Sequence, residues 1–301
     1  ILDYRKAKNL NLLKVKAYFE TKYKVDKIWS GGRHVPGVLK KGNKEFFLKL
    51  ATTEGISAVS KVEYGWNEQF NKSETRLSSK FWVPTNYDSG YYNGNLFYLI
   101  TDKFQGEKLS DYPENKDISP IFLYNLDQIV DFSELIQKLA LKIPAYEDNI
   151  SYRERFVKKT ISWYQNTPKN IRDKYKIKEL VDFVKEGVAT LQKKPRHGDF
   201  TPWHILKLET DHFGLIDGEH ALRDGVEYYD IGYFIQRVFT VLQKPQLAEQ
   251  IIKLLKNRNY DIAKLKTVLA ARAVGGFLDD SLTQFPNYAF SDKFKNWITL
   301  L

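Results

Sequence analysis

Two aspartates on either side of a short apolar stretch are the residues of this sequence best placed to do chemistry. The segment HGDFTPWHILKLETDHFGLID contains Asp199, two apolar runs and then Asp217. A hairpin formed by the two runs would return the chain to its starting end, so both carboxylates can face one side of a cavity. One can orient a hydroxyl while the other holds a metal ion. Phosphoryl transfer needs these two parts, because the acceptor must be positioned and Mg²⁺ must neutralise the phosphate oxygens.

This segment is acidic within a basic protein. Residues 197–230 contain eight acidic and two basic residues, whereas the whole chain of 301 residues has a net charge of +10. An acidic strip suits a divalent cation. Solvated loops would have the same composition, and the charge alone does not decide between the two interpretations.

A lysine and a glutamate in the amino-terminal third form a second candidate pair. Lys49 has a leucine on each side in EFFLKLA, so strand alternation places it on the opposite face from both leucines. At 100° per residue, Glu63 lies within the apolar stripe of the helix predicted over residues 53–72. A carboxylate on an inward face is costly unless it is paired, and Lys49 is the obvious partner. The alternative is that both side chains extend to solvent.

The segment SGGRHVPG, between the first two predicted strands, can let the backbone approach a phosphate. Its glycines are Gly31 and Gly32, but the GxGxxG pattern is absent. A plain hairpin turn is the alternative interpretation.

The elements that must position these residues divide the chain in two. In the first third we predict a helix over 10–23, strands over 25–30, 36–40 and 45–51, a helix over 53–72, and strands near 81 and over 95–101 with a hairpin turn at Asn93-Gly94. Beyond a connection over 102–115 we predict helices over 118–141, 152–166, 177–192, 231–242, 247–257 and 262–273, with strand-like residues between 195 and 217. The fold class is therefore α+β. We expect a small β-rich lobe over 1–103, a larger, mostly helical lobe over 104–301, and a ligand cleft between them.

These motifs resemble those of the aminoglycoside phosphotransferase and choline kinase-like family, which has a two-lobed, protein-kinase-like fold. The family pattern is HGDxxxxN followed by a strand ending in IDW or IDF, and this chain has HGDFTPWH followed by LIDGE. The resemblance implies an ATP-dependent phosphotransferase that moves the γ-phosphate to a hydroxyl of a small molecule.

The resemblance also implies a role for each matching residue. Asp199 would be the catalytic base, and Asp217 and His204 would bind Mg²⁺. Lys49 and Glu63 would position the phosphates of ATP or GTP, assisted by Gly31 and Gly32. The hinge beside the adenine would be Thr101, Asp102, Lys103 and Phe104. His197 and Asp230 would support the catalytic loop.

Two positions depart from the family pattern. His204 replaces the asparagine that is the second metal ligand, and Gly218 replaces an aromatic residue, so that the turn after Asp217 could be looser. Because imidazole is a poorer Mg²⁺ ligand than oxygen, the alternative function is a nucleotide-binding pseudokinase that acts as a binding or regulatory module.

The acceptor that we expect is a small molecule rather than a protein. Gly198 lies where protein kinases carry an arginine, Thr201 lies where serine/threonine kinases carry a lysine, and no APE segment follows. Acidic residues can attract a cationic acceptor, whereas the net charge favours anionic or sugar-like ones, and neither argument prevails. The acidic candidates are Glu219, Asp224, Asp279 and Asp280.

Other classes of function fit less well. His197, His204, His212 and His220 lie close in sequence, but their spacing matches no zinc motif. The basic residues are dispersed and form no known nucleic-acid motif. We expect a cytoplasmic protein without a membrane span, because no apolar run approaches 18 residues, no secretory signal is visible and cysteine is absent. The sequence does not indicate an oligomeric state.

Overall fold

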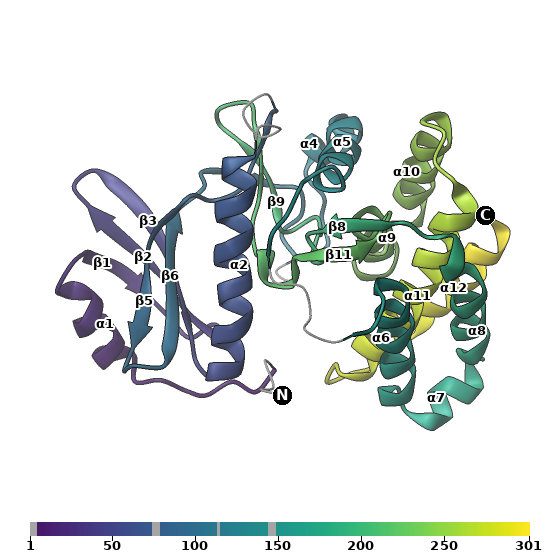
Figure 1. The fold of residues 1–301 in the computed structure, drawn as a ribbon, viewed down its shortest axis with the longest axis horizontal. Coiled ribbons are helices and arrows are strands. Elements are labelled where there is room, and N and C mark those ends of the chain that lie inside the picture. Colours follow the sequence, from purple (N-terminus) through teal and green to yellow (C-terminus); the bar gives the residue numbers. More distant parts are fainter. Residues whose placement is uncertain (1–4, 74–78, 113–114, 144–148) are drawn as a thin grey trace. The chain divides into compact units, whose positions relative to one another are not determined.

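The computed structural model describes residues 5–73, 79–112, 115–143 and 149–301. The chain packs as two compact units (Figure 1). The first unit comprises Ile1–Glu107, Leu141–Ile143 and Leu206–Ala221. The second comprises Lys108–Ala140, Pro144–Ile205 and Leu222–Leu301. Most of the segment just before Asp217 therefore belongs to the first unit rather than to the mostly helical second one.

A five-stranded antiparallel sheet forms the centre of the first unit. Its strand order is β1-β2-β3-β6-β5. The strands are β1 (Lys24–Ile28), β2 (His34–Lys41), β3 (Lys44–Ala51), β5 (Asn86–Tyr92) and β6 (Leu96–Asp102). In the register of the sheet, Lys49 of β3 lies between Pro36 of β2 and Leu99 of β6.

The alternation of residues in β3 separates an apolar face from a functional one. Leu48 and Leu50 are fully buried in a core that Val15 and Phe19 of helix α1 (Leu12–Glu20) complete. Lys49 points to the other face, along which helix α2 (Glu54–Lys72) runs (Figure 1). The sheet therefore presents a lysine to a helix on one face and buries leucines under α1 on the other.

A smaller sheet, with the strand order β4-β10-β9-β7, contains the segment before Asp217. Its strands are β4 (Phe81–Trp82), β7 (Gly106–Lys108), β9 (Ile205–Leu208) and β10 (Phe213–Leu215). The β9–β10 turn is closed by the Leu208 N–H, which donates to the His212 carbonyl at 2.8 Å. The predicted hairpin between the two aspartates is thus present, with Asp217 just after its second strand.

The second unit is mostly helical. Its helices are α4 (Pro120–Tyr124), α5 (Leu126–Ile136), α6 (Tyr152–Asn166), α7 (Lys169–Lys174), α8 (Lys178–Gly187), α9 (Tyr229–Gln236), α10 (Pro245–Asn257), α11 (Ile262–Ser281) and α12 (Ala289–Leu300). The apolar helix α11 is buried along most of its length, because α6, α8, α9 and α12 pack around it. The antiparallel pair β8 (Lys193–Arg196) and β11 (Leu222–Val226) completes the unit.

These elements confirm the α+β class but correct several boundaries. The helix predicted over 118–141 divides at Asn125, which is not helical, and ends at Ile136. The turn at Asn93-Gly94 is confirmed, with positive φ at both residues, but it joins β6 to β5 rather than to the residues near Phe81. Those residues instead pair in parallel with β10. Strand β11 and helix α12 were not predicted.

Candidate active site

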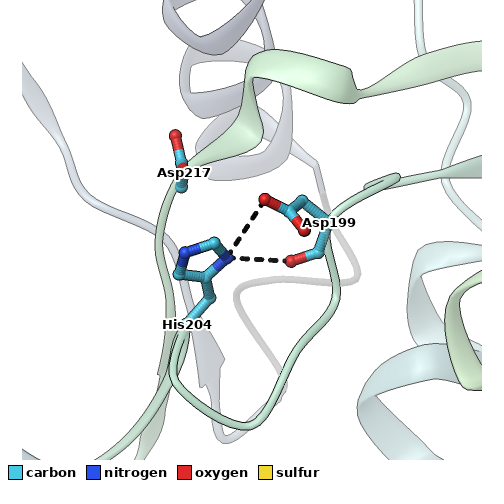
Figure 2. A group of neighbouring side chains, drawn as sticks. All are labelled: Asp199, His204 and Asp217. Atoms are coloured by element: carbon cyan, nitrogen blue, oxygen red, sulfur yellow. Dashed lines mark hydrogen bonds and ion pairs between the residues drawn. The ribbon is translucent and has the colours of Figure 1, made fainter. Parts of the chain in front are cut away.

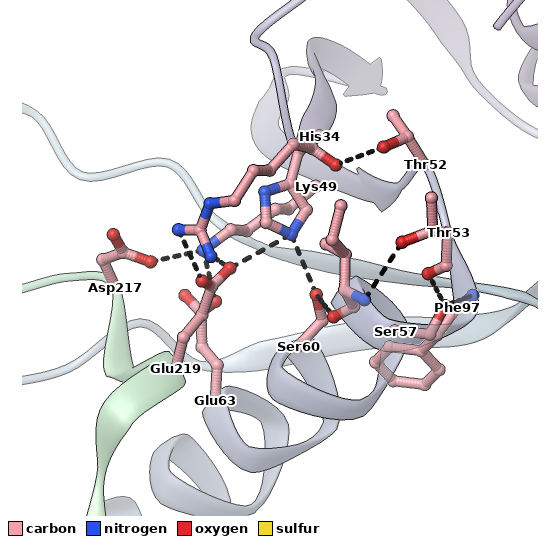
Figure 3. Close-up of polar contacts among 12 residues, drawn as sticks. His34, Lys49, Thr52, Thr53, Ser57, Ser60, Glu63, Phe97, Asp217 and Glu219 are labelled. Carbon is pink, nitrogen blue, oxygen red and sulfur yellow. Dashed lines mark hydrogen bonds and ion pairs between the residues drawn. The ribbon is translucent and has the colours of Figure 1, made fainter. Parts of the chain in front are cut away.

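Lys49 and Glu63 form the ion pair that the sequence predicts. The Lys49 ammonium lies 2.6 Å from Oε2 of Glu63, which projects from the middle of α2 (Figure 3). The side chains are only 15% and 8% exposed, so neither reaches out to solvent. The alternative interpretation, in which both side chains extend to water, is wrong.

Two more carboxylates converge on the same lysine. The Lys49 Nζ lies 2.5 Å from Oδ1 of Asp217 and 2.7 Å from Oε1 of Glu219 (Figure 3). Both acids come from the turn after β10, where Asp217 has φ 67° and ψ 55° and a short 3₁₀ turn follows over Gly218–His220. Asparagine and aspartate tolerate this left-handed conformation better than most residues. This bend in the backbone brings the carboxylates of residues 217 and 219 into contact with the same ammonium group, that of Lys49.

Glu219 is a buried member of this cluster that the sequence did not place beside Lys49. It was a candidate for attracting a cationic acceptor, but its side chain is 1% exposed and fully engaged. Oε2 lies 2.9 Å from Nη2 of Arg33, and Oε1 lies 3.0 Å from Nε2 of His34. The same His34 nitrogen lies 2.9 Å from the Ser60 hydroxyl on α2. The available signal was its spacing, since Glu219 lies two residues beyond Asp217 in the same turn.

The other acids considered for acceptor binding are also engaged within the second unit. Asp224 pairs with Arg223 at 3.0 Å, and Asp279 pairs with Arg237 at 2.8 Å. Asp280 accepts a hydrogen bond from the Ser291 hydroxyl at 2.6 Å. The electrostatic attraction that each could offer to a cationic acceptor is therefore reduced by its partner.

The pKa values in the Lys49 cluster reflect an excess of negative charge. Burial, reinforced by Asp217 and Glu219, raises the pKa of Glu63 to about 7 although Lys49 opposes the shift. Burial also acts to raise the pKa of Glu219, but Lys49 and the hydrogen bond from His34 outweigh it and lower that pKa to about 2. Burial lowers the pKa of His34, which favours its neutral form. Lys49 stays charged, because the three carboxylates outweigh its burial and hold its pKa well above the usual value.

The three carboxylates have the chemistry of a site for a hard cation. Glu63, Asp217 and Glu219 each offer an oxygen, and these oxygens lie within 4.8 Å of one another. Carboxylate oxygens are the ligands that Mg²⁺ prefers. The Lys49 ammonium contacts all three groups, so a metal ion entering this cluster would compete with it.

Gly218 fits tightly against helix α2, contrary to the looser turn that the sequence suggested. A Cβ built at residue 218 would lie 2.4 Å from Cδ1 and 2.8 Å from Cγ of Trp66. Trp66 is completely buried. An indole from α2 thus takes the space beside the turn, and no side chain fits at position 218 without displacing it.

The loop that carries Asp199 is braced by Asp230, which projects from the first turn of α9. The His197 N–H donates to Oδ2 of Asp230 at 2.7 Å, and the Gly198 N–H donates to Oδ1 at 2.8 Å. Gly198 has φ +86°, where glycine is favoured. Burial raises the pKa of Asp230 to about 6 despite these two donors. His197 and Asp230 therefore lie where a supporting role for the loop requires them.

His204 lies beside Asp199 within the same loop. Its Nδ1 is 3.0 Å from the Asp199 carbonyl oxygen and 3.5 Å from the carboxylate oxygen Oδ2 (Figure 2). Both contacts use the same ring nitrogen. A metal ion at His204 would then have to bind Nε2.

The predicted hinge begins inside a strand. Thr101 and Asp102 are the last residues of β6 and pair with β3, so their backbone groups are partly used by the sheet. The side chain of Lys103 lies 2.7 Å from Glu45, and the ring of Phe104 packs against Gly214, leaving no room for a Cβ there. The side chains of Lys103 and Phe104 are thus occupied, and an adenine edge would have to be read by the backbone.

The glycine segment forms a tight hydrogen-bonded turn. The Gly31 N–H donates to the His34 carbonyl at 2.9 Å, and Gly32 has φ +74°. The Arg33 carbonyl accepts two hydrogen bonds from Thr52, one from its hydroxyl at 2.7 Å and one from its N–H at 3.1 Å. The Gly31 amide is therefore used within the turn, whose backbone is fixed to the end of β3.

The histidines that lie close together in sequence do not gather into one group of potential metal ligands in the described part of the chain. Within the described ranges, no group of three or more potential metal ligands contains two histidines. His212 instead stacks on Trp82, with ring centroids 3.9 Å apart. None of the helices in the described part of the chain is both long enough and apolar enough to cross a membrane.

No protein-family model matches the sequence, and comparison with curated proteins finds no significant match. Solved structures do match. Aminoglycoside phosphotransferase APH(4)-Ia aligns with a TM-score of 0.72 at 14% identity, covering 96% of this chain and 99% of its own. A thermostable mutant of it, in a ternary complex with ADP and hygromycin B, aligns at 0.70 and 14% identity over 96% and 97%. Choline kinase LicA from Streptococcus pneumoniae aligns at 0.58 and 12% identity over 96% and 97%. These similarities confirm the protein-kinase-like fold, with its antiparallel sheet and mostly helical carboxyl-terminal part.

Proposed function

We propose that this protein transfers the γ-phosphate of ATP or GTP to a hydroxyl of a small molecule. The observation that carries the proposal is the contact of Lys49 with both Glu63 and Asp217 in a chain whose fold matches that of small-molecule phosphotransferases. A strand lysine paired to a helix glutamate is the arrangement with which kinases position the α- and β-phosphates. Solved structures with this fold have been crystallised with ADP or AMP-PNP and with hygromycin B.

In this proposal Asp217 and His204 would hold Mg²⁺, which would supply positive charge to neutralise the phosphate oxygens. Asp217 offers a hard oxygen ligand and His204 a ring nitrogen, and the two residues flank the β9–β10 hairpin. Lys49 holds the phosphates once its carboxylate contacts rearrange. Glu63 keeps the lysine directed toward the cluster, because burial makes any other position for its carboxylate costly.

Asp199 is the proposed base for the acceptor. Its carboxylate accepts the hydroxyl proton while the hydroxyl oxygen forms a bond to the γ-phosphorus and the bond from that phosphorus to the β–γ bridging oxygen breaks. The products are the phosphorylated acceptor and ADP. The brace from Asp230 to the amides of residues 197 and 198 supports this role, since it fixes the backbone just before the base.

The proposal is tested by incubating the protein with ATP, Mg²⁺ and a panel of hydroxyl acceptors, and measuring ADP release and acceptor mass. We expect transfer to at least one class among aminoglycosides, choline-like alcohols and sugars. Asp199→Ala should lower the rate by roughly 10²–10⁴-fold while leaving ATP affinity within about twofold, because a base acts on the acceptor and not on nucleotide binding.

A matched control is Asp182→Ala, which removes an exposed carboxylate paired with Lys178 on α8 and should not change the rate. Equal rates for Asp199→Ala and the unchanged protein would contradict the assignment of the base. ATP binding with no transfer to any acceptor would instead favour the pseudokinase alternative, to which the histidine at position 204 points.

A further inference from the structure

The Lys49 cluster contains a second cation that no family motif assigns. Arg33 lies in the β1–β2 turn and contacts Oε2 of Glu219, whereas Lys49 contacts Oε1 of the same carboxylate. One carboxylate thus holds both cations side by side. Two neighbouring phosphates of one nucleotide can therefore contact Arg33 and Lys49 at the same time.

Arg33 is held in place by its backbone, and its side chain is partly exposed. Its carbonyl accepts two hydrogen bonds from Thr52, which fixes the turn to the end of β3. Its side chain is 33% exposed, compared with 15% for Lys49, so it is the more exposed of the two side chains. Nη1 of Arg33 is buried and has no hydrogen-bond partner among the residues that the structure describes. A guanidinium with spare donors matches the paired oxygens of a phosphate.

The charge of the cluster also requires a second cation. Glu63, Asp217 and Glu219 are three potential negative charges around Lys49. With Lys49 alone, the cluster would repel a triphosphate. Arg33 is the nearby side chain that reduces this excess, and it extends from the turn where glycines allow close approach.

We propose that Arg33 is a second phosphate-binding residue, which moves from Glu219 to the β- or γ-phosphate when a nucleoside triphosphate binds. The proposal rests on the proposed function, because it assumes that nucleotide occupies the Lys49 cluster. Glu219 is then a positioning residue that keeps the guanidinium beside Lys49 before binding.

The test compares the affinities of Arg33→Gln and the unchanged protein for ATP and for adenosine, with Mg²⁺ present, by calorimetry. We expect the affinity for ATP to fall about tenfold or more, the loss typical of one charge-assisted contact, and the affinity for adenosine to stay within about twofold. Arg33→Lys should restore part of the affinity for ATP, since it keeps the charge but not the fork of donors.

The matched control is Lys27→Gln, which removes one exposed cation from the neighbouring strand β1, where it lies over the ring of Trp29. This control should leave both affinities unchanged. Equal ATP affinity in Arg33→Gln and the unchanged protein would overturn the role of Arg33, and so would equal losses for ATP and adenosine, which would indicate general damage to the unit. Failure of the unchanged protein to bind ATP would instead overturn the proposed function, so the two failures are distinguishable.

Discussion

At the scale of single residues, the cluster around Lys49 has more carboxylates than its cations balance. Three acids share one lysine, and Glu63 is the group whose pKa rises, to about 7 from an ordinary value of 4.5. Active sites collect such perturbed groups because their geometry serves binding and chemistry rather than stability. In the proposed function, a triphosphate and its metal ion would replace some of these contacts.

The raised pKa of Glu63 makes a prediction about stability and pH. The folded state binds the Glu63 proton more tightly than the unfolded state does, so this stabilisation is fully present below pH 4.5 and is lost as the pH rises through about 7. The Glu63→Gln variant has no carboxylate at this position, so it does not lose this stabilisation as the pH rises. The free energy of unfolding of Glu63→Gln minus that of the unchanged protein should therefore increase between pH 5 and pH 8, by on the order of 2 kcal/mol.

Chemical denaturation across this pH range, without nucleotide or metal, measures the effect. Glu68→Gln on the same helix is the control, because Glu68 pairs with Lys72 near the surface. A difference between Glu63→Gln and the unchanged protein that does not vary with pH would show that the Glu63 carboxylate stays charged throughout.

The sequence predicted several of these residues and not others. Lys49 and Glu63 were identified because strand and helix periodicities each place one charge on an inward face. Arg33 could not be identified, because it lies in a turn, where no periodicity indicates the direction of a side chain. His34 is the first residue of β2 and lies outside the strand predicted over 36–40. The burial of Glu219 depends on the left-handed backbone at Asp217, and no local sequence pattern predicts that conformation.

At the scale of elements, the turn after β10 and helix α2 fit together as a matched pair. Trp66 occupies the space into which a side chain at position 218 would project. The family aromatic is absent from the turn, and a buried indole on the facing helix fills the region. The turn is thereby held by packing rather than by its own side chain.

A double-mutant cycle tests this fit. Gly218→Phe should destabilise the protein by about 2 kcal/mol through overpacking, and Trp66→Ala should destabilise it by about 3 kcal/mol through the cavity it leaves. In the double variant the ring introduced at 218 can use the space vacated by Trp66, so the combined cost should be smaller than the sum by at least about 1 kcal/mol. Costs that simply add in denaturation experiments would contradict the proposed complementarity.

Periodicity also explains which elements could be predicted. Helix α2 and strand β3 have long, regular patterns, and both were placed correctly. Strand β11 has few residues and contains Gly225, so it had no clear alternation. The short strand β4 was assigned to the wrong partner, because its pairing with β10 joins segments more than 100 residues apart. No local signal specifies such a contact.

At the scale of the whole molecule, a net charge of +10 coexists with an acidic cluster around one lysine. The net positive charge alone would be compatible with binding to nucleic acid. The carboxylates and the lysine of the cluster are instead the types of residue that bind a metal ion and phosphates. The fold is similar to those of aminoglycoside phosphotransferase and choline kinase structures, which align over nearly the whole chain. Lys49 belongs to the first unit and Asp199 to the second.

The central claim is therefore that Asp199, Asp217 and Lys49 act on a single nucleotide. A crystal structure of the protein with Mg²⁺ and a non-hydrolysable ATP analogue tests it most directly. We predict that Lys49 contacts the α- or β-phosphate, that Asp217 binds the metal ion, and that Asp199 faces the γ-phosphate with room for an acceptor hydroxyl between them. A nucleotide bound elsewhere, or an Asp199 carboxylate directed away from the γ-phosphate, would contradict the account.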